Sequence, residues 1–211
     1  MKPRVLVTRH VYPAAIAMLQ EHFAVDYHDS YDVLDEARLL RRLQHADGVV
    51  CQLTDPLTRA VIEQAPRLRV IAQLAVGFDN IDVAAATERR IVVTNTPDVL
   101  TEATADLTFA LLLSVARRLP AAERFLRSGQ WQRWDVDLLC GADVHGRTLG
   151  IVGLGRIGRA VARRARGFGM RVLYTSRREL ADEPEAMRVP LDMLLRESDF
   201  VSLHVPLRAE T

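Results

Sequence analysis

Three glycines with the G-x-G-x-x-G spacing, Gly153, Gly155 and Gly158, have the residue type and spacing of a phosphate-binding turn. They directly follow the apolar run 148–152, and a helical pattern begins at once after them. In such a turn the first glycine allows a tight bend, the second leaves room for a pyrophosphate, and the third lets the helix pack close to the strand. The phosphates would bind N–H groups at the positive end of that helix. The motif predicts a dinucleotide site, with a plain tight turn as the alternative.

The residues that would read the ribose of this dinucleotide lie at 175–178, Thr-Ser-Arg-Arg. An NAD site carries an acidic side chain about 20 residues past the glycines, whereas an arginine there accommodates a 2′-phosphate. No carboxylate precedes Glu179. A hydroxyl and two guanidinium groups suit a phosphate dianion through charge-assisted hydrogen bonds. We therefore expect Ser176, Arg177 and Arg178 to favour NADP(H), with NAD(H) possible as a second cofactor; the alternative is a solvated arginine pair on a surface loop.

The elements that position these residues alternate regularly along the chain. Apolar runs at 4–8, 24–28, 48–52, 70–74 and 91–95 alternate with helical patterns, which predicts a parallel, doubly wound α/β domain. Thr58 is expected to cap a helix. After residue 147 only the runs 148–152, 171–174 and 200–205 resemble strands, so we expect the first half of a dinucleotide-binding domain there, without the second half.

The segment between the two sets of strands has a different character. Thr101 is predicted to cap a helix that Pro120 stops and whose apolar face runs through Leu107, Leu111 and Val115. A polar and aromatic stretch at 129–146 follows, with Trp131 and Trp134. Long irregular segments of this kind are functional or form interfaces, and we expect these tryptophans to pack a subunit contact in a homodimer, with contact to a ligand as the alternative.

Composition excludes several classes of function. The chain has 211 residues with 28 basic and 27 acidic side chains, a net charge of +1, and no basic stripe, so we expect no nucleic-acid partner. Neither a membrane span nor a signal peptide is indicated, and the expected location is cytoplasmic. Cys51 and Cys140 lie far apart and form no C-x-x-C pair, so no metal site is predicted.

The chain as a whole resembles the D-2-hydroxyacid dehydrogenases, and within them the glyoxylate/hydroxypyruvate reductase branch. The motifs that carry the resemblance are the loop 75–82 (Ala-Val-Gly-Phe-Asp-Asn-Ile-Asp), the run 96–101 (Thr-Pro-Asp-Val-Leu-Thr) with the helix start 103–107, the arm 129–134 (Gly-Gln-Trp-Gln-Arg-Trp), the fingerprint 150–158, the run 174–178 and the ending 204–207.

This resemblance implies two domains, with the active site between them. Residues 1–99 would be a flavodoxin-like substrate or catalytic domain, and residues 100–211 an incomplete Rossmann-type NAD(P)-binding domain. Backbone N–H groups at Val76 and Gly77 would bind the substrate carboxylate, and Leu53 would line the apolar side of the substrate pocket. In the cofactor domain, residues near the nicotinamide, the pyrophosphate and the adenine would be Thr104, Arg156, Ile157 and Pro206.

The chemistry that the resemblance implies is NADPH-dependent reduction of a small 2-keto acid, glyoxylate or hydroxypyruvate, to the 2-hydroxy acid. The family's arginine, carboxylate and histidine would lie beyond Thr211, so we name no catalytic residue and expect the 211-residue chain to be inactive. Alternatives are another D-2-hydroxyacid dehydrogenase of the phosphoglycerate or lactate type, and a non-catalytic nucleotide-sensing corepressor of the same fold. A fragment that folds only its first domain and acts as an interaction module is a further alternative.

Overall fold

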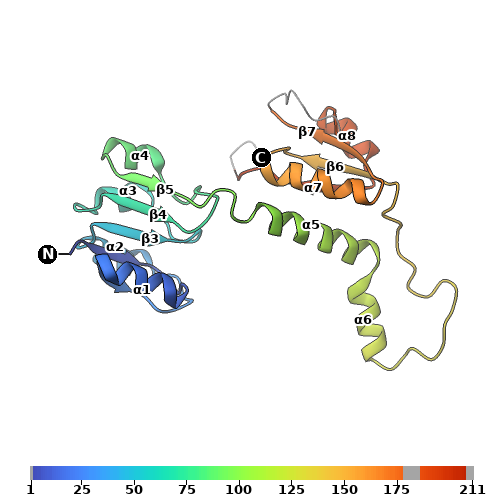
Figure 1. Ribbon diagram of the computed structural model, residues 1–211, viewed down its shortest axis with the longest axis horizontal. Helices are drawn as coiled ribbons and strands as arrows, with labels where there is room; N and C mark the ends of the chain where they lie inside the picture. Colours follow the sequence, from blue (N-terminus) through green and yellow to red (C-terminus); the bar gives the residue numbers. More distant parts are fainter. Residues whose placement is uncertain (1, 178–185, 208–211) are drawn as a thin grey trace. The chain divides into compact units, whose positions relative to one another are not determined.

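The computed structural model describes residues 2–177 and 186–207, and these form two compact units (Figure 1). The first unit ends at Asp98, and the second comprises Val99–Pro206. Each unit contains its own parallel β-sheet. The predicted α/β class with two parallel sheets, the second of them smaller, is therefore confirmed.

The first unit is a five-stranded parallel sheet in the order β2-β1-β3-β4-β5. This is the flavodoxin-like strand order that the family resemblance implied. Its elements, in chain order, are β1 (Arg4–Val7), α1 (Pro13–His22), β2 (Ala24–Tyr27), α2 (Glu36–Leu43), β3 (Gly48–Cys51), α3 (Arg59–Glu63), β4 (Val70–Gln73), α4 (Val83–Glu88) and β5 (Val92–Thr94). The predicted strands are all present, each one or two residues shorter than the apolar run that indicated it.

Local capping explains where several of these helices begin. The side chain of Thr58 accepts a hydrogen bond from the N–H of Val61, which confirms the predicted cap of α3. Asp82 caps α4 in the same way by accepting from Ala85. Such a side chain satisfies one of the N–H groups that the first turn of a helix leaves without a partner.

The core of the first unit lies on both faces of the sheet. On one face, α2, α3 and α4 bury Leu39, Leu43, Ile62 and Ala85 against strand residues such as Ile71. On the other face, α1 packs on β1 and β2. The part of this second face that lies over β4 and β5 is open: Val70 and Val92 are exposed and line an apolar hollow together with Leu19 and Phe23 of the α1 segment.

The second unit has a four-stranded parallel sheet in the order β8-β7-β6-β9. Its elements are α5 (Thr101–Ala116), α6 (Leu119–Arg127), β6 (Thr148–Val152), α7 (Arg156–Gly167), β7 (Arg171–Thr175), β8 (Met187–Arg188), α8 (Leu191–Glu197) and β9 (Phe200–Leu203). Strand β8 is a two-residue strand that the sequence pattern did not predict. One face of the sheet is covered by α7, against which α5 packs, and the other by α8.

Two expectations for the ends of α5 were wrong. The residue before the helix is Leu100 and no side chain caps it, so Thr101 is the first helical residue. The helix ends at Ala116, and Pro120 lies in the first turn of α6, where its missing N–H costs nothing.

The apolar face that the sequence predicted for α5 does not pack into the unit. Leu107, Leu111 and Val115 are exposed, with 57%, 58% and 76% of their surfaces accessible. The face that packs into the unit instead contains Ala105 and Phe109, and Phe109 stacks on Phe168 with ring centroids 5.2 Å apart. Because α5 is apolar on both sides, its sequence did not reveal which side the core would take.

Candidate cofactor and substrate sites

The fingerprint glycines occupy the turn between β6 and α7, and the fold requires two of the three. Gly153 has φ = +96°, and a Cβ there would lie 2.5 Å from the carbonyl oxygen of His204. A Cβ on Gly158 would lie 2.3 Å from the carbonyl oxygen of Gly153. At Gly155, by contrast, a Cβ would meet no heavy atom of the described residues within 4 Å, apart from those of Gly155 and its two chain neighbours. The space in front of Gly155 is open, and packing within the chain gives no reason for a glycine there.

Helix α7 starts at this turn with Gly155 as its N-cap residue. Its first helical hydrogen bond runs from the N–H of Arg159 to the carbonyl of Gly155, 2.9 Å. The first turn of α7, to which Arg156 and Ile157 belong, carries the positive end of the helix. The arrangement can bind an anion such as a pyrophosphate.

The residues predicted to read the ribose lie beside this turn. The N–H of Gly153 donates to the carbonyl of Thr175, the last residue of β7, at 2.9 Å. Ser176 follows and accepts a hydrogen bond at its carbonyl from Arg188, 3.1 Å, while Arg177 is exposed. Arg178 lies outside the described residues, so its contribution stays a prediction.

The end of β9 also lies next to the glycine turn. The N–H of His204 donates to the carbonyl of Val152, 2.8 Å, and Pro206 follows two residues later. Burial lowers the pKa of His204, whose ring nitrogen Nε2 lies 2.9 Å from the hydroxyl of Ser202. The carboxyl ends of three parallel strands thus meet at one edge, which is where doubly wound sheets bind ligands.

Thr104 lies in the first turn of α5, which is tied to α7 by ion pairs. Arg163 contacts Glu102 at 2.8 Å, and Arg164 contacts Asp106 at 2.6 Å. These carboxylates raise the pKa of Arg164, the hydrogen bond to Asp106 having the larger effect. The half-buried Thr104 is therefore held on a helix that packs beside the cofactor helix.

The predicted substrate residues lie in the first unit, at the carboxyl ends of β3 and β4. Leu53 follows β3 and is 54% exposed; Val76 and Gly77 follow β4. A Cβ on Gly77 would lie 3.6 Å from Cδ2 of Leu53. The fold therefore brings an apolar side chain and the predicted carboxylate-binding turn together from two separate loops.

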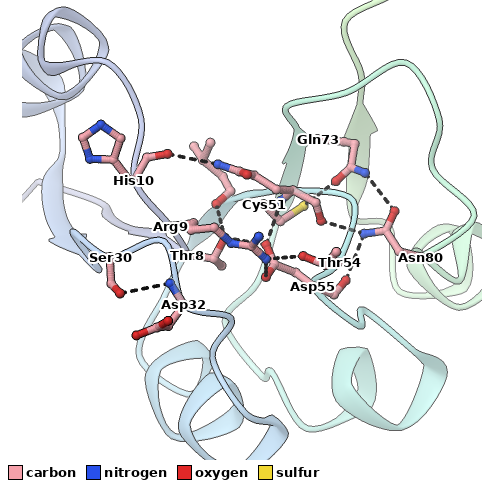
Figure 2. A network of polar contacts seen from close by, with 12 residues as sticks. Thr8, Arg9, His10, Ser30, Asp32, Cys51, Thr54, Asp55, Gln73 and Asn80 are labelled. Atoms are coloured by element: carbon pink, nitrogen blue, oxygen red, sulfur yellow. Dashed lines mark hydrogen bonds and ion pairs between the residues drawn. The ribbon is translucent and has the colours of Figure 1, made fainter. Parts of the chain in front are cut away.

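A buried polar network beneath these loops was missed by the sequence reasoning (Figure 2). The carboxylate of Asp55 is almost fully buried; it accepts hydrogen bonds from the hydroxyl of Thr8 at 2.6 Å and the N–H of Gln52 at 2.7 Å, and pairs with Arg9 at 3.3 Å. Asn80 donates to the carbonyls of Gln52 and Asp55. Buried polar side chains are normally hydrogen-bonded, and here they fasten the loops after β1, β3 and β4 to one another.

The sequence signal for this network was an amide within an apolar strand. Gln73 lies in the apolar run Val70–Gln73 and is only 2% exposed. Its carboxamide oxygen accepts a hydrogen bond from the thiol of Cys51, 3.0 Å. Burial, and secondarily the charge of Asp55, raises the pKa of this thiol to about 12. Cys51 is thus a protonated hydrogen-bond donor, in addition to being the buried small apolar residue that the sequence indicated.

Two other kinds of feature are absent from the described residues. No group of three or more histidine, cysteine, aspartate or glutamate side chains in these residues is arranged to hold a metal ion. No helix within them has both the length and the apolar character that a membrane crossing needs.

The second unit has a parallel sheet with a G-x-G-x-x-G turn at its carboxyl edge. This combination is typical of α/β proteins with a Rossmann-type fold. The profile described as "D-isomer specific 2-hydroxyacid dehydrogenase, catalytic domain" matches residues 5–196. The chain belongs to this family.

Named relatives extend the comparison. A glyoxylate reductase from Korarchaeum cryptofilum is 52% identical over 215 residues, which cover the whole chain and 65% of that relative. The crystal structure of the TT0316 protein from Thermus thermophilus is 48% identical, with a TM-score of 0.92, over 99% of this chain and 66% of that one. An NADPH-dependent glyoxylate/hydroxypyruvate reductase from Sinorhizobium meliloti, solved with NADP and malonate, is 35% identical with a TM-score of 0.86, over 100% and 64%. The chain thus spans about two thirds of these proteins.

Proposed function

We propose that the protein is an oxidoreductase that uses NADPH to reduce glyoxylate or hydroxypyruvate to the corresponding 2-hydroxy acid. The observation that carries the proposal is the open space at Gly155. The fold itself requires glycine at positions 153 and 158, but not at 155. A glycine that no intramolecular contact demands, at the mouth of a helix, has its explanation in a ligand that approaches the backbone. The relatives named glyoxylate reductase supply the substrate class.

The preference for NADPH rests on the end of β7. Thr175 and Ser176 stand where an NAD-binding chain carries a carboxylate, and the exposed Arg177 follows. A guanidinium group can bind a 2′-phosphate with two charge-assisted hydrogen bonds. The Sinorhizobium reductase, which resembles this chain, was solved with NADP.

Each predicted residue has a role in this proposal. Gly153, Gly155, Gly158, Arg156 and Ile157 hold the pyrophosphate, and Ser176, Arg177 and Arg178 hold the 2′-phosphate. Thr104 and Pro206 border the nicotinamide and the adenine. Bound NADPH supplies the hydride. The N–H groups of Val76 and Gly77 bind the substrate carboxylate, and Leu53 contacts the apolar side of the substrate.

The acid that protonates the carbonyl oxygen is not assigned to a residue of this chain. The pair His10 and Asp29, with 2.7 Å between Nδ1 and Oδ1, is one histidine–carboxylate arrangement among the described residues. Its surroundings are those of a structural contact: the hydroxyl of Tyr27 donates to the same Asp29 oxygen, and the His10 ring packs on Tyr31. We accordingly propose that the 211-residue chain binds the cofactor but does not turn over the substrate.

We also propose that the protein forms a homodimer. The exposed stripe of Leu107, Leu111 and Val115 on α5 is followed along the chain by exposed Trp131 and Trp134. Exposed apolar side chains gathered on one helix, with tryptophans nearby in sequence, are typical of a protein–protein interface.

Two measurements test the function. Calorimetric titration of the 211-residue chain should show binding of NADPH that is tighter than binding of NADH. A chain extended at its C-terminus by the part of a glyoxylate reductase relative that it does not cover should oxidise NADPH when glyoxylate or hydroxypyruvate is added. Tighter binding of NADH would contradict the cofactor assignment. An extended chain that reduces neither acid but accepts another from a panel of 2-keto acids would move the assignment to a different dehydrogenase of the family.

A further inference from the structure

The carboxylate-binding loop after β4 is held in place by two consecutive residues at the end of β5. The N–H of Thr96 donates to the carbonyl of Ala75, 2.9 Å. The side-chain Nδ2 of Asn95 donates to the carbonyl of Val76, also at 2.9 Å. The carbonyl groups of two successive peptides are therefore both directed toward residues 95–96.

This arrangement fixes the direction of two N–H groups. A trans peptide is planar, and its N–H points away from its carbonyl oxygen. The peptide that contains the Ala75 carbonyl carries the N–H of Val76, and the peptide that contains the Val76 carbonyl carries the N–H of Gly77. Both N–H groups thus point away from residues 95–96, and so to a common side of the loop.

Neither N–H has an intramolecular acceptor among the hydrogen bonds of the described residues, although Val76 is half-buried. A backbone donor that is shielded from water without a partner costs free energy, which an acceptor from a ligand would recover. Two successive N–H groups on one side of a loop form an anion-binding concavity. Gly77 is exposed, so an anion can reach them.

The other end of the loop is held by the buried network (Figure 2). The amide nitrogen of Gln73 donates to the carbonyl of Gly77 at 3.1 Å and to Oδ1 of Asn80 at 2.8 Å. The Cys51 thiol donates to the amide oxygen of Gln73. This bond fixes the orientation of the amide, so that its nitrogen faces the carbonyl of Gly77. Hydrogen bonds therefore hold the carbonyl groups of both Val76 and Gly77, which lie on either side of the Gly77 N–H.

We propose that Asn95 is a positioning residue for the substrate carboxylate. It does not touch the substrate; by holding the Val76 carbonyl, it keeps the Gly77 N–H turned toward the anion. The role requires a donor, which a carboxamide provides and an ionised carboxylate of the same shape does not. The inference rests on the proposed function only in taking a 2-keto carboxylate as the anion.

The test is an amide NMR titration of the isotope-labelled 211-residue chain with oxamate, a 2-keto acid analogue that accepts no hydride. In the wild type, the proton signals of Val76 and Gly77 should move downfield as oxamate binds, because their N–H groups gain a charged acceptor. Asn95→Ala should weaken oxamate binding about tenfold, the effect expected when one hydrogen bond that orients a charged contact is lost. The Gly77 shift at saturation should also shrink.

Gln64→Ala is the matched control. Gln64 is an exposed amide whose nitrogen donates to the carbonyl of Ala60 at 3.2 Å, at the end of α3, and its removal should leave the titration unchanged. Asn95→Asp keeps the shape and removes the donor, so it gives a second variant if Asn95→Ala unfolds. Chloride at equal ionic strength should not produce the Gly77 shift.

The outcomes separate this inference from the proposed function. A wild-type titration without shifts at Val76 and Gly77, or a folded Asn95 variant that binds oxamate as tightly as the wild type, would overturn the positioning role. If oxamate binding depends on Asn95 but the extended chain does not reduce glyoxylate, the inference stands and the proposed reaction falls. In an active extended chain, Asn95→Ala should raise KM for glyoxylate and leave KM for NADPH unchanged.

Discussion

The peptide nitrogen of Gly153 donates a hydrogen bond to the carbonyl oxygen of Thr175, 2.9 Å away. This bond joins the turn expected to hold the pyrophosphate to the end of β7, where a dinucleotide-binding sheet reads the ribose. Gly153 and Thr175 are 22 residues apart in the sequence but in direct contact in the fold. Ser176 and Arg177, which follow Thr175, therefore lie next to the glycine turn.

Arg177→Asp should reverse the cofactor preference. The substitution removes a charged donor for the 2′-phosphate and adds a carboxylate that can accept from a ribose hydroxyl, so the ratio of NADPH to NADH affinity should fall at least about tenfold. Calorimetric titration of the folded variant with each cofactor measures this ratio. Arg41→Asp, an equal charge change on an exposed residue of α2, serves as the control. An unchanged preference in Arg177→Asp would remove the basis for the NADP assignment.

Gly155→Ala and Gly158→Ala should impair different properties, NADPH binding in the first and stability in the second. Gly155 has φ = −79° and open space around it, so alanine fits the fold but blocks the pyrophosphate; the melting temperature should hold while NADPH binding is lost. Gly158→Ala places a methyl group against the Gly153 carbonyl and should cost about 1–3 kcal/mol of stability, as overpacked cores do.

Thermal unfolding followed by circular dichroism, paired with NADPH titration, distinguishes the two variants. If Gly155→Ala bound NADPH with wild-type affinity, the glycine would have no ligand-related role and the cofactor site would have to lie elsewhere.

The two cysteines should react very differently. Cys140 is exposed, whereas Cys51 is buried with its pKa raised to about 12. At pH 8 one thiol per folded chain should react with a disulfide reagent, because the thiolate is the reactive form and Cys51 stays protonated. In folded Cys140→Ser no thiol should react. In urea both thiols of the wild type should react. Rapid reaction of Cys51 in the folded chain would contradict its role as a buried donor to Gln73.

The raised pKa of Cys51 also has a consequence for stability at alkaline pH. The folded state keeps this thiol protonated after the unfolded chain has begun to release its proton near pH 9, so the contribution of the thiol is complete below that pH. It is lost as the pH rises toward about 12. Cys51→Ala should therefore flatten the decline of the unfolding free energy above pH 9, measured by urea titration at each pH.

The sequence predicted the two sheets because parallel strands buried on both faces appear as continuous apolar runs, such as 48–52 and 148–152. The glycine turn was predictable because its spacing follows from backbone geometry. The network of Asp55, Gln73 and Asn80 was not, since it joins residues up to 47 positions apart in the sequence and each residue alone has an ordinary type. The substrate residues Leu53, Val76 and Gly77 came from the family resemblance; their proximity is a property of the folded chain.

The exposed face of α5 leads to the prediction about assembly. Leu107, Leu111 and Val115 were predicted to share one apolar face, because helical spacing shows that side chains share a face without showing what covers it. In the second unit that face is exposed, while Ala105 and Phe109 pack inward.

If a second copy of the chain covers the stripe of Leu107, Leu111 and Val115, Leu111→Arg should convert a dimer to a monomer, since an interface core does not tolerate an unpaired buried charge. Sedimentation velocity reports the change, and Met18→Arg, at an exposed apolar position on α1, should leave the dimer intact. A wild-type chain that sediments as a monomer at micromolar concentration would refute the homodimer and leave the stripe for a different partner.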